Sequence, residues 1–247
     1  MHSIKSKPTN YIAFAFCILL QSLNLQGQSF DLLDPKSVNR EFKPAFQAGD
    51  GKLVHGDSGF QYTTEEPTEK DYDYRFVVPA RLKAGKDFEI IADLTNGSIA
   101  ESSSEVASIG IEVYQKNNLS NRLASELSVA RLQGYFSRTI FSQIVASGEK
   151  MFDCFSSDLR VPERSKIKLK YNSKLKVFSI HYLDFDKINW VSVGSFGIAG
   201  DGGASGNAHW KMRSSETFLL YVYGFSKNMK IYDGDIQLHS LEINHNL

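Results

Sequence analysis

The chain has 247 residues, 42% of them hydrophobic, and its 28 Lys and Arg residues balance its 28 Asp and Glu residues. Because there is no basic excess, the composition argues against nucleic acid as a partner, and the lack of an acidic tail argues against a strongly charged one. This length suits one large domain with a substantial core better than two small domains.

The N-terminal segment has the layout of an export signal. Lys5 and Lys7 precede an apolar run over residues 11–20, which is followed by a polar segment with small residues. The run is too short to span a bilayer, and no other stretch is long and apolar enough for a membrane helix. We therefore predict a signal peptide over residues 1–27 and a mature chain, residues 28–247, that is secreted or periplasmic.

The predicted mature chain contains a single cysteine. Cys17 lies within the predicted signal, and Cys154 alone remains after its removal. A lone cysteine cannot form an internal disulfide, so the core must hold the fold. The position of Cys154 between Phe152 and Phe155 predicts a small buried apolar residue rather than a catalytic thiol.

The first half of the mature chain shows short apolar stretches separated by Gly, Pro, Asn and Asp, the pattern of strands joined by turns. Four such strands are expected at residues 29–33, 52–56, 59–64 and 72–79. Alternation of apolar residues predicts two more, at 87–94 before the turn pair Asn96-Gly97, and at 106–115 before Asn117-Asn118.

A helix competes with strands only over residues 123–145. Leu123 and Leu127 have a loose helical spacing, but the aromatic and β-branched residues after Gly134 favour β-structure. We predict two strands in this stretch, joined by a turn at Gly134.

A meander of three strands is predicted over residues 166–193. Basic and apolar residues alternate strictly over 166–171, which places three ammonium groups on one face of a strand and three apolar side chains on the other. Residues 172–173 form a turn, and the apolar phase of the returning strand shifts near Val177, which predicts either a bulge there or a strand covered on both faces. The third strand spans 188–193.

A glycine-rich loop at 194–207 follows the meander, and two more strands are expected at 217–225 and 231–243. The loop is interpreted as a connection at the rim, with a binding loop as the alternative. Many short strands without an internal repeat or linker predict an all-β fold, a two-sheet antiparallel jelly-roll β-sandwich formed as a single domain.

Four apolar patterns carry a resemblance to a known superfamily and cover about two-thirds of the mature chain. They are residues 86–90, residues 109–113, the lysine-rich hairpin that runs on to Trp190, and the closing strand 222–224 with the segments that follow it. In this order they resemble the concanavalin A-like lectin/glucanase superfamily, in particular the laminin-G-like jelly rolls of secreted bacterial proteins. The resemblance implies carbohydrate binding on a concave sheet and, in some members, glycan hydrolysis by two carboxylates.

The sequence lacks the motifs that catalysis would require. The glucanases of this superfamily carry Glu-x-Asp-x-Glu on one strand, and this chain has no such pattern. The acidic pairs at 87/89, 184/186 and 233/235 are predicted to lie at strand ends or turns. There is no Gly-x-Ser-x-Gly motif, and the histidines lack metal-binding spacing. No catalytic residue is predicted, and a hydrolase would need a carboxylate pair that forms only in the fold.

Aromatic side chains are the stronger indication of function, because Trp and Tyr stack on the apolar faces of sugar rings while polar neighbours bind the hydroxyls. We predict a carbohydrate-binding face formed by Trp210, Trp190, Tyr182, Tyr221, Tyr223, Asn207 and His209. Trp210 is expected to be an exposed platform because it follows the glycine-rich loop. For Trp190 and the strand tyrosines, burial in the core is the competing interpretation.

Lectin-like sandwiches often hold a structural Ca²⁺, so the resemblance implies such an ion here, with Asp235 as its candidate ligand. The function expected is non-catalytic binding of a polysaccharide or a cell-surface glycan, or of another extracellular surface. The alternatives are a glycan hydrolase and a structural or adhesive extracellular protein without a small ligand. Two facing acids, one with a raised pKa, would favour hydrolysis, and a filled, flat sheet face would favour the structural protein.

Overall fold

The computed structural model describes residues 27–30, 43–56, 59–65, 71–184, 186–199 and 204–245. The predicted export signal lies outside these residues except for Gly27. The described residues form strands and turns without a helix, and hence without any helix long and apolar enough to cross a membrane. The predicted all-β class is confirmed.

One layer is a nine-stranded sheet in which every neighbouring pair is antiparallel except β13 and β14. In sheet order its strands are β14 (Gly206–Asn207), β13 (Trp190–Gly197), β12 (Val177–Leu183), β11 (Arg164–Asn172), β6 (Phe88–Asn96), β16 (Ile236–His245), β4 (Gly59–Thr63) and β3 (Lys52–Gly56), with β1 (Gln28–Phe30) also pairing with β16.

The other layer is a seven-stranded antiparallel sheet. In sheet order its strands are β10 (Glu149–Phe155), β9 (Tyr135–Ala146), β8 (Asn118–Leu132), β7 (Val106–Gln115), β15 (Thr217–Lys227), β5 (Asp71–Lys83) and β2 (Lys43–Ala48). Strands β8 and β9 occupy the stretch where a helix competed, and the prediction of two strands joined at Gly134 is confirmed.

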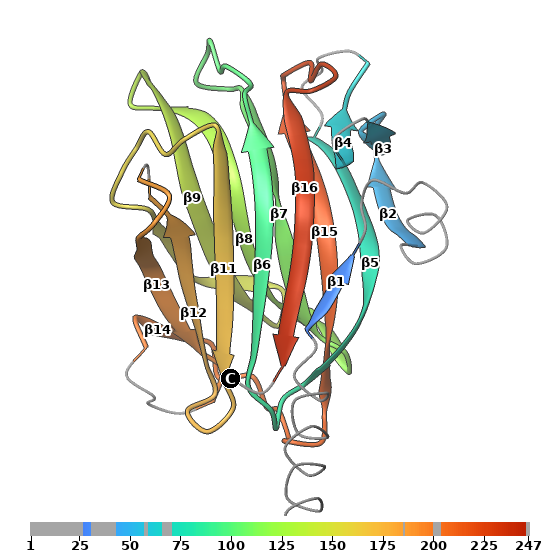
Figure 1. Cartoon of the computed structure of the whole chain (residues 1–247), viewed down its shortest axis with the longest axis vertical. Coiled ribbons are helices and arrows are strands. Elements are labelled where there is room, and N and C mark those ends of the chain that lie inside the picture. Colours follow the sequence, from blue (N-terminus) through green and yellow to red (C-terminus); the bar gives the residue numbers. More distant parts are fainter. Residues whose placement is uncertain are drawn as a thin grey trace, which may run out of the picture.

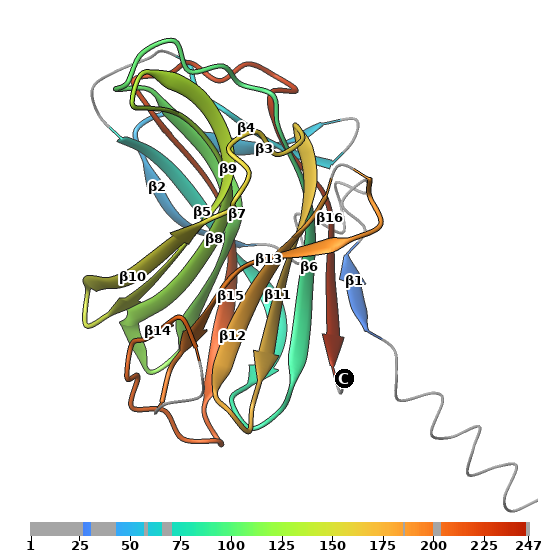
Figure 2. The same cartoon turned by 90° about the vertical axis from the view of Figure 1, so that its left-hand side faces the viewer.

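The two sheets lie face to face as a sandwich (Figure 1). In the side view the seven-stranded sheet is strongly curved, and its concave face is turned away from the nine-stranded sheet (Figure 2). We call this outer surface the concave face. The space between the sheets holds an apolar core.

Alternation in β11 explains how that strand joins the core. Ile167, Leu169 and Tyr171 are fully buried and lie opposite Ala92, Ile90 and Phe88 of β6. Each large apolar side chain so buried contributes about 2 kcal/mol, while the alternate lysines face solvent. Aromatic rings close one end of this core, where Tyr171, Phe178, Phe88 and Phe218 contact one another with centroid distances of 4.6–6.1 Å.

Three details differ from the sequence-based expectations. The register shift between β12 and β13 falls between Ile180 and His181 rather than near Val177. Strands β2 and β10 were not predicted. Cys154 is half-buried rather than buried, and burial raises the pKa of its thiol to about 11, which keeps the thiol protonated and unreactive at neutral pH.

The end of the sandwich where β6 leads into β7 is fixed by a buried amide. The Nδ2 atom of Asn96 donates to the carbonyl oxygens of Ala107, at 2.9 Å, and Leu127, at 3.0 Å, on the opposite sheet. Its backbone N–H donates to the carbonyl of Glu163 at 2.9 Å. These bonds hold the two sheets together beneath the loops that form the hollow described below.

Candidate functional site

The seven side chains predicted to bind carbohydrate do not form one site. Trp210 and Tyr182 lie in the core, each only 2% exposed. The Nε1 atom of Trp210 donates to the carbonyl oxygen of Val145 at 2.9 Å, and its ring lies 6.4 Å from that of Phe178. The expectation that Trp210 is exposed is therefore wrong, because contacts with β9 and β12 hold its indole between the two sheets.

Three more of the predicted residues lie at separate places. Trp190 is half-buried on the outer face of the nine-stranded sheet, with the Nζ atom of Lys168 3.7 Å from its ring centroid. Asn207 and His209 are joined by a bond from the backbone N–H of His209 to Oδ1 of Asn207, at 2.9 Å. His209 borders a polar hollow next to Gln115, at the C-terminal end of β7. Trp190 and His209 therefore cannot contact one small ligand.

Tyr221 and Tyr223 alone remain together, on the concave face. Tyr221 lies opposite Glu112 of β7, and its ring meets that of Tyr114 edge to face at 4.9 Å. Tyr223 lies opposite Gly110, and its hydroxyl reaches across that glycine to donate to Oε2 of Glu126 on β8. The absence of a side chain at Gly110 leaves room for this bond.

Glu112 is the centre of an ion-pair network on the concave face, although it is only 2% exposed. Its Oε2 atom accepts from Nε of Arg75 at 2.7 Å and from the hydroxyl of Tyr114 at 3.1 Å. Its Oε1 atom lies 3.4 Å from Nη1 of Arg122, and Arg75 also contacts Asp73 at 2.8 Å. Both oxygens of Glu112 are occupied, so the burial of its charge is compensated.

Glu126 has a different environment one strand away. Burial raises the pKa of its carboxyl from 4.5 to about 7, although bonds from Tyr223 and Ser108 oppose the shift and Glu112 adds to it. Burial, together with the nearby carboxylates, also raises the pKa of Tyr223 well above 10, so its hydroxyl stays a donor. Two neighbouring strands thus carry one carboxylate whose oxygens are both paired and one carboxyl that gains or loses its proton near neutrality.

The pKa of Glu126 predicts a pH-dependent stability. The folded chain binds this proton more tightly than the unfolded chain, so the free energy of unfolding falls as the pH rises from 4.5 to 7, with no further loss above 7. Glu126→Gln removes this dependence and is expected to stabilise the fold at pH 8 by up to about 3 kcal/mol, with little effect at pH 5. Urea unfolding from pH 5 to 8 measures the difference, and Glu149→Gln, at an exposed position, serves as the control. Equal pH profiles for the wild type and Glu126→Gln would contradict the prediction.

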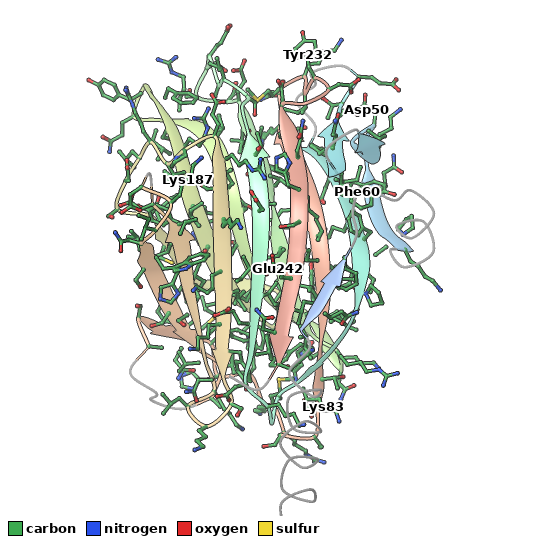
Figure 3. The ribbon with its side chains drawn as sticks, viewed as in Figure 1. Asp50, Phe60, Lys83, Lys187, Tyr232 and Glu242 are labelled. Carbon is green, nitrogen blue, oxygen red and sulfur yellow. The ribbon has the colours of Figure 1, made fainter. Side chains whose placement is uncertain are left out.

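A hollow of about 480 Å³ opens at the end of the sandwich, between the β6–β7 and β15–β16 loops. We call it the end hollow. Tyr232, 62% exposed, and Ile99, 67% exposed, provide its apolar walls, and Figure 3 shows Tyr232 at this end of the molecule. Carboxylates of Glu101, Glu105 and Asp235 provide acceptors. An exposed aromatic ring beside convergent polar groups is the composition of a small-ligand site.

The architecture is similar to that of solved lectin structures. Lectin II from Ulex europaeus, solved with galactose, superposes with a TM-score of 0.57 and 11% identity, over 90% of this chain and 99% of that one. The carbohydrate recognition domain of Emp46p gives 0.56 and 10%, over 89% and 98%. The exoplasmic domain of VIP36, in a form bound to Ca²⁺ and Man2, gives 0.53 and 10%, over 89% and 88%. The chain has a concanavalin A-like lectin fold.

This lectin-like fold is what the sequence patterns implied, and the predicted jelly-roll sandwich is confirmed. No family model matches the sequence, and no curated protein is significantly similar to it. At 10–12% identity the likeness describes the arrangement of strands, and the chemistry has to be derived from this chain's own side chains.

Asp235 is the residue expected from the sequence to hold a Ca²⁺ ion. Relatives in fold include calcium-bound and potassium-bound forms. In the described part of this chain, no group of three or more His, Cys, Asp or Glu side chains could hold a metal ion. The carboxylate of Asp235 instead accepts from the backbone N–H of Tyr232 at 3.2 Å. Asp235 belongs to the wall of the end hollow, and its role as a Ca²⁺ ligand stays a prediction.

Sequence reasoning named Tyr223 and Asp235 but not their neighbours Tyr232, Glu112 and Glu126. Tyr232 lies in the stretch 231–243 that was predicted as a strand, whereas β16 begins only at Ile236, so Tyr232 belongs to the turn before it. An aromatic residue next to the Asp-Gly-Asp turn residues is a signal of exposure that could have marked it. Glu112 and Glu126 each alternate with core residues of a predicted strand, which places both on an outer face. Their proximity depends on the pairing of β7 with β8, in which Gly110 lies opposite Glu126, and no local pattern specifies that register.

Proposed function

We propose that this chain binds carbohydrate in the end hollow, with Tyr232 as the stacking platform and the carboxylates of Glu101, Glu105 and Asp235 as acceptors for sugar hydroxyls. The observation that carries the proposal is the exposed Tyr232 ring beside a polar hollow of about 480 Å³. The lectins of similar fold, whose structures hold galactose or Man2, add support from the fold.

The arrangement suits one or two sugar rings. A hollow of this size lies within the range of small-molecule sites, about 300–1,000 Å³. Lys230 approaches the Tyr232 ring with its Nζ atom 5.4 Å from the centroid, which helps to hold the aromatic plane in place. Asp235 is fixed by the 232–235 turn, since its backbone N–H donates to the carbonyl of Tyr232 at 3.2 Å. Acceptors on a fixed turn distinguish ligands by the position of their hydroxyls.

Tyr232→Ala is expected to weaken binding to the best ligand at least about tenfold, because stacking is lost while the fold is unaffected at this exposed position. The measurement is retention on a panel of immobilised and insoluble polysaccharides, followed by calorimetric titration of the best ligand. Tyr135→Ala is the matched control, since Tyr135 is 76% exposed and does not line the end hollow. Retention of the wild type on no glycan would contradict the proposal and favour a structural or adhesive protein.

Glycan hydrolysis has one supporting observation, the proximity of Glu126, with its pKa of about 7, to Glu112. A retaining or inverting hydrolase needs an acid and a free carboxylate across the scissile bond. Both oxygens of Glu112 are held by Arg75, Arg122 and Tyr114, and the side chain is 2% exposed, so this carboxylate cannot readily reach a substrate. Non-catalytic binding is therefore the better supported function. Release of reducing sugar that disappears in Glu126→Gln would reverse this preference.

Export of the chain is part of the proposal, because the predicted signal over residues 1–27 would deliver the protein to polysaccharides or cell-surface glycans. Sequencing of the N-terminus of the protein recovered outside the cytoplasm is expected to begin at Gln28. An N-terminus at Met1 in that fraction would contradict the signal.

A further inference from the structure

A second hollow lies on the opposite layer from the concave face. It occupies the outer face of the nine-stranded sheet, between the start of β11 and residues Asp184 and Lys187, and has a volume of about 290 Å³. We call it the sheet-face hollow. Lys187 lines this hollow and Tyr232 lines the end hollow, and Figure 3 shows the two residues at different places on the molecule. The charged side chains that line it are Asp93, Arg164, Lys166, Asp184 and Lys187.

Arg164 is held in a fixed orientation at this hollow. Its Nε and Nη2 atoms each lie 3.0 Å from an oxygen of Asp93, which makes the pair bidentate. Asp93 is 6% exposed, whereas the side chain of Arg164 is 58% exposed. The buried carboxylate thus fixes one edge of the guanidinium, and the remaining N–H groups, including both on Nη1, are available to a ligand.

Two ammonium groups complete the positive lining. Among the described residues, the side chains of Lys166 and Lys187 make neither a hydrogen bond nor an ion pair. Lys187 adopts a left-handed backbone conformation, with φ of 56°, that is unusual for a residue with a side chain. Its turn is closed by the carboxylate of Asp186, which accepts from the N–H groups of Ile188 and Asn189 at 2.8 and 3.0 Å.

The charges favour an anionic ligand. Asp93 is already neutralised by Arg164, which leaves two lysines against the single carboxylate of Asp184. Lys168 and Lys170 continue the basic row along the same face of β11. A cluster with an excess of positive charge, partly enclosed by protein, attracts an anion more strongly than isolated surface lysines do.

The apolar border of the hollow indicates the kind of ligand to which the anionic group is attached. Leu183 lines the hollow, and its cross-strand neighbour on β13 is Trp190. Cations beside an apolar strip match a charged sugar, which has an anionic substituent on a ring with apolar C–H faces. We propose that the sheet-face hollow binds the anionic group of an acidic polysaccharide, a uronate carboxylate or a sulfate, through Arg164, Lys166 and Lys187.

The test is a calorimetric titration of the purified chain with three oligosaccharides of equal length: oligogalacturonate, a sulfated oligosaccharide and a neutral one. The double variant Lys166→Gln/Lys187→Gln is expected to weaken binding of the anionic ligand at least about tenfold. Lys170→Gln, on the same strand and face but outside the hollow, is the matched control and is expected to change affinity less than about twofold. Tyr232→Ala is expected to leave anionic binding intact, which separates this site from the end hollow.

The relative affinities of the uronate and the sulfated ligand show whether the site prefers a carboxylate or a sulfate. Three results would overturn the proposal: no binding of either anionic ligand, equal affinity of the wild type and the double variant, or an equal loss in Lys170→Gln. The last would mean that the whole basic row acts by charge alone. Circular dichroism of each variant checks the fold, and all three lysines are at least partly exposed, so their replacement should not unfold the chain.

Discussion

Trp210→Ala is expected to lower the free energy of unfolding by about 3–5 kcal/mol, because it removes a large side chain that is 2% exposed from the core. The substitution leaves a cavity between the sheets and deprives the carbonyl of Val145 of its 2.9 Å bond from the indole. Urea or thermal unfolding followed by far-ultraviolet circular dichroism measures the loss. Sugar binding is expected to fall only in proportion to the fraction of the variant that is unfolded.

Trp190→Ala is the matched control for this prediction. Trp190 is half-buried on an outer sheet face, and its principal contact is with the ammonium of Lys168 at 3.7 Å. Loss of this contact is expected to cost about 1 kcal/mol. If Trp210→Ala were as stable as the wild type and yet lost carbohydrate binding, Trp210 would be a surface platform, and the burial described above would be wrong.

Arg75→Met is expected to destabilise the fold by about 3–5 kcal/mol at pH 7, since it removes the closest counter-ion of a buried carboxylate. Arg75 contacts Glu112 at 2.7 Å and Asp73 at 2.8 Å, and its side chain is only 18% exposed. Met keeps much of the volume of the Arg side chain, so the loss reports the charge rather than a cavity. Denaturant unfolding of the variant and the wild type provides the measurement.

A double-mutant cycle with Glu112→Gln separates the ion pair from its surroundings. In the Arg75→Met background, Glu112→Gln removes the uncompensated charge and is expected to recover part of the stability. A cost below about 1 kcal/mol for Arg75→Met, with additive single changes, would show that the pair behaves as an exposed salt bridge. In that case Glu112 would be free to contact a ligand, and its pairing would no longer count against hydrolysis.

The proposals place ligands on two different surfaces of one sandwich. The end hollow depends on loop residues, above all Tyr232, whereas the sheet-face hollow depends on Arg164 and two lysines at strand and turn positions. The two hollows share no lining residue, so variants of one are expected to leave the other unchanged and each proposal can fail alone. Neither proposal uses the concave face, because its polar side chains bond mainly to one another.

Much of the strand pattern could be predicted from local sequence. Alternation over residues 166–171 placed Ile167, Leu169 and Tyr171 on the core side of β11, and the burial of all three confirms it. Turn residues such as Gly134 marked strand ends, because a positive φ is needed there and glycine tolerates it. The even spacing of these strands predicted a sandwich, which the likeness to solved lectins confirms.

Side-chain placement on the two faces was harder to predict, because both faces of a strand in this sandwich are partly covered. Tyr182 and Tyr223 both alternate with other apolar or aromatic residues, yet one lies in the core and the other on the concave face. Trp210 follows a glycine-rich loop, which suggested exposure. The contacts with Val145 and Phe178 that bury it join positions distant in the chain.

The sequence by itself determined most of the strands and the two-sheet sandwich, because period-two alternation and turn chemistry act over a few residues. Only the tertiary structure decided which side chains share a surface. Strand order and register brought Glu112 beside Arg75 and Glu126 beside Tyr223, and loop packing brought Tyr232 to Glu101 and Glu105. Those contacts arise from cross-strand and loop geometry between segments far apart in the chain, which no local pattern encodes.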